Sequence, residues 1–148
     1  MRNTERIYAL SEPQNHRCCY CGHHMIRHQH ISGLPTPRNA ITKDHFEPRM
    51  YGGETVEENL IAACCQCNNL RGEMDAFAFF NLMQKWFKRD PSLRVRWHLI
   101  SREELGELKI QCQSVHARQL HGLGRNSIEF AFRHFHFVRQ WRKNSLRA

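Results

Sequence analysis

Two Cys-x-x-Cys pairs constrain the fold of this chain more than any other feature of its sequence. Cys18 and Cys21 form the first pair, Cys64 and Cys67 form the second, and 42 residues separate the two pairs. Zinc in proteins favours four tetrahedral ligands, and one Cys-x-x-Cys turn can present two thiolates to one ion. The two pairs therefore predict a single four-cysteine zinc site. Zinc binding would offset the chain entropy that is lost when so long a loop is closed.

Other uses of these cysteines stay open at the level of the sequence. A Cys-x-x-Cys pair can be a thioredoxin-like redox pair, but the βαβ pattern of that fold is missing and there are two pairs. Cys19, Cys65 or a nearby histidine can replace one of the four ligands. In a reducing compartment such pairs bind metal more often than they form structural disulfides. The remaining Cys112 lies on an apolar helical stripe, so we expect it to be a core residue.

The segment between the pairs predicts two strands joined by a loop. Residues 40–42 are β-prone and lead into Asp44 and His45, and Pro48 marks the break that follows. Residues 59–63 predict a second strand that returns toward the first. This unit is too small to bury a core of its own, so we expect its stability to depend on the zinc ion.

Helices are expected to make up most of the remaining chain. One helix begins near Cys65 and ends at Gly72, where a C-cap requires a positive φ. Another follows Asp75, its expected N-cap. That helix carries the apolar stripe Phe79, Leu82, Met83, Trp86 and Phe87 at the spacing of one helix face. The apolar alternation over residues 93–99 predicts a half-buried strand with a cationic outer face.

The C-terminal part of the chain combines helix signals with a strong positive charge. Ser101-x-x-Glu104 and Asn126-x-x-Glu129 are capping boxes, and each predicts the start of a helix. A short helix over residues 6–10 is also expected. Residues 118–148 hold seven Lys/Arg and one Asp/Glu, in a chain of net charge +8. Such a basic segment favours a polyanion partner, most often nucleic acid, although a solvated helix face has the same composition.

Length and hydropathy favour one ordinary fold and exclude a membrane-spanning class. The chain has 148 residues, enough for a domain with a real core. No apolar run approaches the ~20 residues needed to cross a bilayer, and the start of the chain leads into no apolar stretch of signal-peptide length. We therefore expect a cytoplasmic protein without membrane contact. We divide it into a zinc-bound core of residues 1–73 and a mainly helical basic extension of residues 74–148, and the two can form one domain.

Asp44, His45 and Asn68 are the candidate residues for chemistry. Phosphodiester hydrolysis needs a base that deprotonates water, and a histidine serves this purpose near neutral pH. A divalent ion can stabilise the phosphoryl and leaving oxygens, and the Asp44 carboxylate and Asn68 amide offer it hard oxygen ligands. Neighbouring strand residues point to opposite faces, so Asp44 and His45 can flank one substrate only where the strand ends or bends. Arg71 lies three residues after Asn68 on the same helix face and can approach the same phosphate.

Together these residues resemble the HNH endonucleases, which have a zinc-bound ββα-metal (His-Me finger) fold. The matching motifs are both cysteine pairs, Asp44-His45, Pro48-x-x-x-Gly52-Gly53, Asn59-Leu60 and Cys64-x-x-Cys67-Asn68-x-x-Arg71-Gly72. The resemblance implies an α+β fold with a small ββα-metal core and a four-cysteine zinc site. It implies that His45 is the general base, that Asp44 and Asn68 hold one Mg²⁺, Mn²⁺ or other divalent ion, and that Asn59 braces the loop. Arg71 stands where the family often has lysine, and Asn68 where many members have histidine.

The function implied by this resemblance is metal-dependent hydrolysis of phosphodiester bonds in DNA. The products would carry 5′-phosphate and 3′-hydroxyl ends, and double-stranded DNA is the expected partner. One active site must act twice, or the chain must dimerise, to cut both strands, so a monomer or a homodimer is expected. The alternative is a zinc-stabilised nucleic-acid-binding module without catalysis, which would bind tightly and be indifferent to substitution of Asp44 and Asn68.

Overall fold

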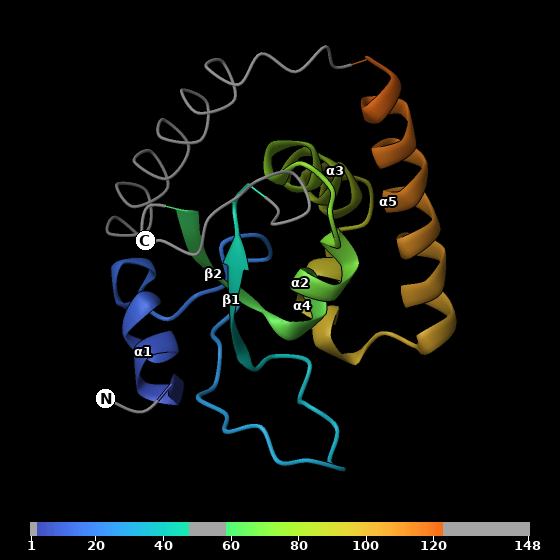
Figure 1. Cartoon of the computed structure of the whole chain (residues 1–148). Helices are drawn as coiled ribbons and strands as arrows, with labels where there is room; N and C mark the ends of the chain where they lie inside the picture. The colour runs from blue at the N-terminus through green and yellow to red at the C-terminus, as the bar shows by residue number, and fades with distance from the viewer. Residues whose placement is uncertain (1–2, 48–58, 123–148) are drawn as a thin grey trace.

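A computed structural model describes residues 3–47 and 59–122, and Figure 1 shows how their elements are arranged. The elements in chain order are α1 (Asn3–Leu10), η1 (Glu12–Gln14), β1 (Ile41–His45), β2 (Leu60–Cys64), α2 (Cys65–Arg71), α3 (Ala76–Arg89), α4 (Pro91–Val95), η4 (Trp97–Leu99) and α5 (Arg102–Gly122). The predicted α+β class with a mainly helical second half is confirmed. The Pro48-to-Gly53 loop, the helix expected from Asn126 and most of the basic C-terminal segment lie outside the described residues.

The two predicted strands form one antiparallel hairpin. β1 and β2 pair from Ile41 opposite Cys64 to His45 opposite Leu60. β1 ends at His45, so the candidate residues Asp44 and His45 are the last two of this strand. α1 and α2 both contact the hairpin, and Figure 1 shows them on opposite sides of it.

β2 passes directly into α2 without an intervening residue. Cys64 is the last residue of β2 and also the N-cap of α2, and its Sγ accepts a hydrogen bond from the N–H of Cys67. α2 ends at Gly72, which has a φ of 55°, and the N–H of Gly72 donates to the carbonyl of Asn68. The predicted C-cap with a positive φ is therefore confirmed.

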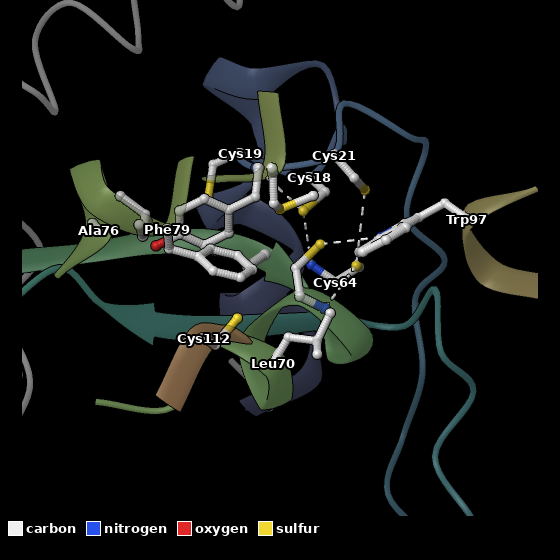
Figure 2. Packing of buried hydrophobic residues seen from close by; sticks show 14 of the residues in the cluster. Cys18, Cys19, Cys21, Cys64, Leu70, Ala76, Phe79, Trp97 and Cys112 are labelled. Atoms are coloured by element: carbon white, nitrogen blue, oxygen red, sulfur yellow. Dashed lines mark hydrogen bonds between the residues drawn. The ribbon is translucent and has the colours of Figure 1, made fainter. Parts of the chain in front are cut away.

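α3 follows the predicted cap and stripe. The carboxylate of Asp75 accepts from the N–H of Ala78, as expected for an N-cap. Of the predicted stripe, Phe79, Met83, Trp86 and Phe87 are buried and Leu82 is partly buried against them. Figure 2 shows part of this core, in which the ring of Phe79 packs edge-on against the ring of Tyr20 with centroids 4.8 Å apart.

The strand predicted over residues 93–99 is wrong, because these residues form α4 and η4. Pro91 is the first residue of α4, a position where its missing N–H has no partner to lose. Leu93 and Trp97 are 4% and 0% exposed, whereas Val95 and Leu99 are 82% and 86% exposed. Burial therefore follows the i, i+4 spacing of a helix face, and only half of the alternating apolar residues enter the core.

α5 begins at the first predicted capping box. The hydroxyl of Ser101 accepts from the N–H of Glu104, and Leu108 and Cys112 of the expected apolar face are buried. Trp86 of α3 donates from its indole to Gln111 of α5. Within residues 3–47 and 59–122, no helix has both the length and the apolar character needed to cross a membrane.

One buried cluster contains residues from both halves of the chain. It extends from Cys18 in the first half to Cys112 on α5, and Trp97 lies in it fully buried. The side chain of Gln66 on α2 donates to the carbonyl of Trp97 at 2.8 Å. The extension after residue 73 thus packs on the predicted core and shares its hydrophobic interior.

Candidate functional site

The four cysteines of the two pairs converge in the buried interior. The sulfur atoms of Cys18, Cys21, Cys64 and Cys67 all lie within 4.8 Å of one another. The Sγ atoms of Cys21 and Cys64 are 3.9 Å apart. Four sulfurs at ~2.3 Å from a tetrahedral zinc are about 3.8 Å apart, so this spacing fits a zinc ion. Figure 2 shows Cys19 apart from the converging sulfurs of Cys18, Cys21 and Cys64.

Backbone N–H groups donate to the sulfurs, and the four cysteines share hydrogen bonds that shift their pKa values in different directions. The Sγ of Cys18 accepts from the N–H groups of Tyr20 and Cys64 at 3.4 and 3.3 Å. Burial raises the pKa of Cys18, but hydrogen bonds from the neighbouring thiols outweigh it and lower that pKa well below its usual value. Hydrogen bonds with Cys18 and Cys21 raise the pKa of Cys64 well above its usual value, and burial does the same for Cys67. A thiolate is the form that binds a metal ion, so metal binding at this cluster would release protons.

Two further partners of the sulfurs come from η4, outside the segment where the ligands lie. The indole Nε1 of Trp97 donates to the Sγ of Cys67 at 3.3 Å. The Nε2 of His98 lies 3.3 Å from the Sγ of Cys64, within hydrogen-bond distance. Such outer contacts orient metal ligands and tune the site. Sequence reasoning missed both residues, because their distance from the cysteines in the chain gives no spacing pattern.

A cavity of about 320 Å³ lies where β1 ends and α2 runs past it. It is lined by Lys43, Asp44, His45, Asn68, Asn69, Gly72 and Glu73. The structure thus brings three predicted site residues, Asp44, His45 and Asn68, to one cavity. Asn59 and Arg71 do not line it.

Asp44 is buried, and one of its two carboxylate oxygens is fully engaged. Its Oδ2 accepts from the hydroxyl of Tyr20 at 3.0 Å and from Nη1 of Arg71 at 2.7 Å. Burial raises the pKa of Asp44 above its usual value, and the Arg71 guanidinium opposes that rise. No partner of Oδ1 is found among the described residues. The carboxylate is therefore fixed by one oxygen, which leaves the other for a ligand such as a metal ion.

Arg71 is buried and enclosed by hydrogen-bond acceptors of the protein itself. Its side chain is 0% exposed, and besides Asp44 it donates to the carbonyls of His45, Phe46 and Met74. Burial lowers the pKa of Arg71, but the nearby Tyr20 and Asp44 outweigh it and raise that pKa above its usual value. The guanidinium is thus enclosed, and Arg71 does not line the cavity. Its contacts instead tie α2 to the end of β1.

Asn68 is oriented by the strand that it faces. Its Nδ2 donates to the hydroxyl of Thr42 at 2.9 Å and to the carbonyl of Lys43 at 3.1 Å. Both amide N–H groups are thus used on β1, and the side-chain oxygen is directed away from those two partners. Oδ1 is the atom of this side chain that can coordinate a cation.

Asn59 joins the two ends of the hairpin loop. Its Oδ1 accepts from the N–H of Glu47 at 2.8 Å, and its Nδ2 donates to the carbonyl of Glu47 at 3.1 Å. The backbone carbonyl of Asn59 also accepts from the N–H of Phe46. These bonds lie directly after His45 in the chain. They have the geometry that a loop-bracing residue needs, and that role remains a prediction.

Several residues that shape the cavity were not foreseen. Tyr20 lies between the first two cysteine ligands, and nothing in that motif signals a contact with Asp44. Thr42 stands two residues before Asp44, so the alternation of side chains along a strand places both on one face. Lys43 and Glu73 line the cavity, but isolated charges of this kind carry no recognisable pattern.

Comparison with known proteins agrees with this geometry over part of the chain. Residues 18–73 match the model of the HNH endonuclease family. No match is found among curated proteins or among solved structures. The matched segment contains the four clustered cysteines and every residue that lines the cavity. The resemblance to HNH endonucleases is thus confirmed for this segment, and it supports a nuclease-type or other nucleic-acid-related function with a cysteine metal site.

Proposed function

We propose that this HNH segment is the catalytic part of a metal-dependent endonuclease that hydrolyses phosphodiester bonds in DNA. The observation that carries the proposal is the single cavity lined by Asp44, His45 and Asn68. Three groups with complementary chemistry meet there at the end of one strand. A role in phosphate chemistry explains a histidine, a carboxylate and an amide in this arrangement better than a role in stabilising the fold does.

His45 acts as the general base in this proposal. It takes a proton from a water molecule whose oxygen attacks the phosphorus atom. The bond from phosphorus to the 3′-oxygen breaks as the new bond forms, and the departing oxygen gains a proton from solvent. The products are a 5′-phosphate and a 3′-hydroxyl. Histidine suits this step because its usual pKa lies near neutral pH.

Two oxygen atoms of the chain fit a divalent ion such as Mg²⁺ or Mn²⁺. They are Oδ1 of Asp44 and Oδ1 of Asn68, each left over when the rest of its side chain is bound within the protein. Hard cations of this kind take oxygen ligands from one or two side chains and from phosphate. When bound, the ion would neutralise charge on the phosphoryl and leaving oxygens.

The neighbouring side chains of the motif hold these groups in place. Arg71 and Tyr20 fix Oδ2 of Asp44, and Thr42 fixes the amide of Asn68. We assign Arg71 a positioning role in place of a direct phosphate contact. Double-stranded DNA remains the proposed partner. The thiols, none of them in a disulfide, favour a reducing compartment such as the cytoplasm.

The test compares plasmid nicking by the wild type and His45→Ala with Mg²⁺ or Mn²⁺ present. Loss of a general base should lower the rate by about 10²–10⁴-fold. His30→Ala is the matched control, because His30 is exposed on the loop before β1 and lines no part of the cavity. Zinc content is measured for each protein, so that loss of the fold is recognised.

Equal cleavage by the wild type and His45→Ala would refute the assignment. DNA binding without any turnover in the zinc-loaded wild type would favour the alternative, a non-catalytic binding module. In that case substitution of Asp44 by Asn should leave DNA affinity unchanged.

A further inference from the structure

A second cavity adjoins the candidate active site. It has a volume of about 540 Å³ and lies between α2, α5 and the segment before β1. α2 and α5 pack side by side, as Figure 1 shows. Asn69 lines both cavities, so the two cavities adjoin at this residue. α5 lies outside the residues that match the HNH family, so this cavity is partly built by the extension.

The described lining of this second cavity is basic. Arg38, Arg102 and Lys109 line it, and none of the lining residues is acidic. Lys109 donates to the carbonyls of Asn69 and Leu70, and Arg38 donates to the carbonyl of Ile100. Those two cations are therefore held in place. Arg102 is exposed and makes no hydrogen bond or ion pair within the described part of the chain, so its guanidinium is available to a ligand.

The same cavity also has apolar and hydrogen-bonding surface. Leu70 and Leu105 contribute apolar lining. Gln66 lines the cavity too, and its Oε1 is buried without a partner in the described residues. A nucleotide combines a phosphate for the cations with a flat base for the apolar lining. Amino groups on a base supply donors of the kind that an unpaired amide oxygen accepts.

We propose that this cavity is a nucleotide subsite for the strand whose scissile phosphate occupies the first cavity. The strand crosses Asn69 and places a neighbouring phosphate against Arg102, and the base of that nucleotide, unpaired from the complementary strand, lies on the apolar lining. This inference rests on the proposed function, because the strand is the substrate of the same site. It assigns part of substrate binding to α5, at a place that the HNH motif does not specify.

The test measures binding, with the full zinc-loaded chain carrying His45→Ala so that no strand is cut. Single-stranded DNA of increasing length, from a dinucleotide upward, competes with a labelled strand. Arg102→Glu is compared with Lys85→Glu, which makes the same charge change at an exposed position of α3 away from the cavity. Arg102→Glu should not harm folding, because an acidic residue is favourable in the first turn of a helix.

Arg102→Glu should weaken binding of the longer strands by about tenfold and leave the dinucleotide unaffected. The slope of log affinity against log salt should fall by about 0.7, as for one phosphate contact on a single strand. Lys85→Glu should show neither effect. Equal losses of affinity for the two variants, or the same loss at every strand length, would overturn the subsite. Either result would mean that the change in net charge weakens binding without a local phosphate contact.

Cys65 provides a second readout of occupancy. It lines this cavity and is partly exposed, whereas the other six cysteines are buried. Longer strands should slow its modification by maleimide, and the dinucleotide should not. Unchanged modification with a saturating long strand contradicts the subsite. These measurements do not involve cleavage, so failure of the subsite and failure of the proposed catalysis are separable.

Discussion

At the scale of single residues, the hydrogen bonds that hold each side chain decide which of its atoms can meet a ligand, as Asp44 and Asn68 illustrate. The types and order of the Cys, Asp, His and Asn residues predicted which side chains would lie together, because each type can bind a metal ion or act on a phosphate. Arg71 was different. Its cationic type suggested a phosphate contact, but the carbonyls of Phe46 and Met74 that enclose it become visible only in three dimensions.

Arg71→Leu should lower the free energy of unfolding by about 3–5 kcal/mol. It would leave the buried Asp44 charge without its partner, which is the costly way to break a buried ion pair. Denaturant unfolding of the zinc-loaded proteins measures this loss. Arg89→Leu, at an exposed position of α3, should change stability by no more than about 0.5 kcal/mol. If Arg71→Leu abolished cleavage at unchanged stability, a direct catalytic role would replace the positioning role.

Cys112 should resist alkylation in the native protein. Burial raises its pKa to about 11, so at pH 8 about one thiol in a thousand is a reactive thiolate. The thiolate fraction should rise about tenfold for each pH unit until that pKa is reached. Mass spectrometry of the zinc-loaded protein after maleimide treatment should find Cys65 modified first and Cys112 modified mainly after unfolding. Prompt modification of Cys112 at pH 8 contradicts its burial.

At the scale of elements, helix caps and helical apolar stripes predicted secondary structure more reliably than the period-two alternation of apolar residues did. Asp75, Gly72 and Ser101 were assigned as caps because their side chains or φ angles satisfy helix ends, and each does so in the structure. The alternation of apolar and polar residues over 93–99 predicted a strand wrongly, because an apolar side chain is not necessarily a buried one. Pro91 at a helix start was the stronger local signal.

Leu93→Ala should cost about 2–5 kcal/mol of unfolding free energy, because it opens a cavity in the core that also holds Trp97. Leu99→Ala is the matched control and should cost less than about 0.5 kcal/mol, since Leu99 is exposed at the end of η4. Urea unfolding of both variants gives the comparison. Equal losses would restore the half-buried strand, in which both leucines face the same side.

At the scale of the whole molecule, the four-cysteine cluster and the extension are in direct contact. Trp97 donates to the Cys67 sulfur from within the shared core, and His98 lies beside Cys64. The sequence predicted two parts with a boundary near residue 73, because the family motif ends there. It contained no sign of these contacts, since they join residues that are far apart in the chain and follow no motif.

A fragment of residues 1–75 should therefore hold zinc more weakly than the full chain. It lacks the Trp97 donor and the apolar cover from α3 and α5, so its thiolates meet water. Competition with a coloured zinc chelator measures both proteins, and circular dichroism follows the fold as zinc is withdrawn. Equal zinc retention would show that the first 75 residues fold independently of the extension.

The direct passage from β2 into α2 has a consequence for how this chain can change in length. Cys64 is the last residue of β2, the N-cap of α2 and a member of the four-cysteine cluster. No loop residue between β2 and α2 could therefore absorb a change in length. One residue inserted after Cys64 would turn α2 by about 100° and carry Asn68 away from Thr42. Variants with added or deleted residues should thus survive in the long loop before β1, where no ligand is displaced, and be lost at this joint.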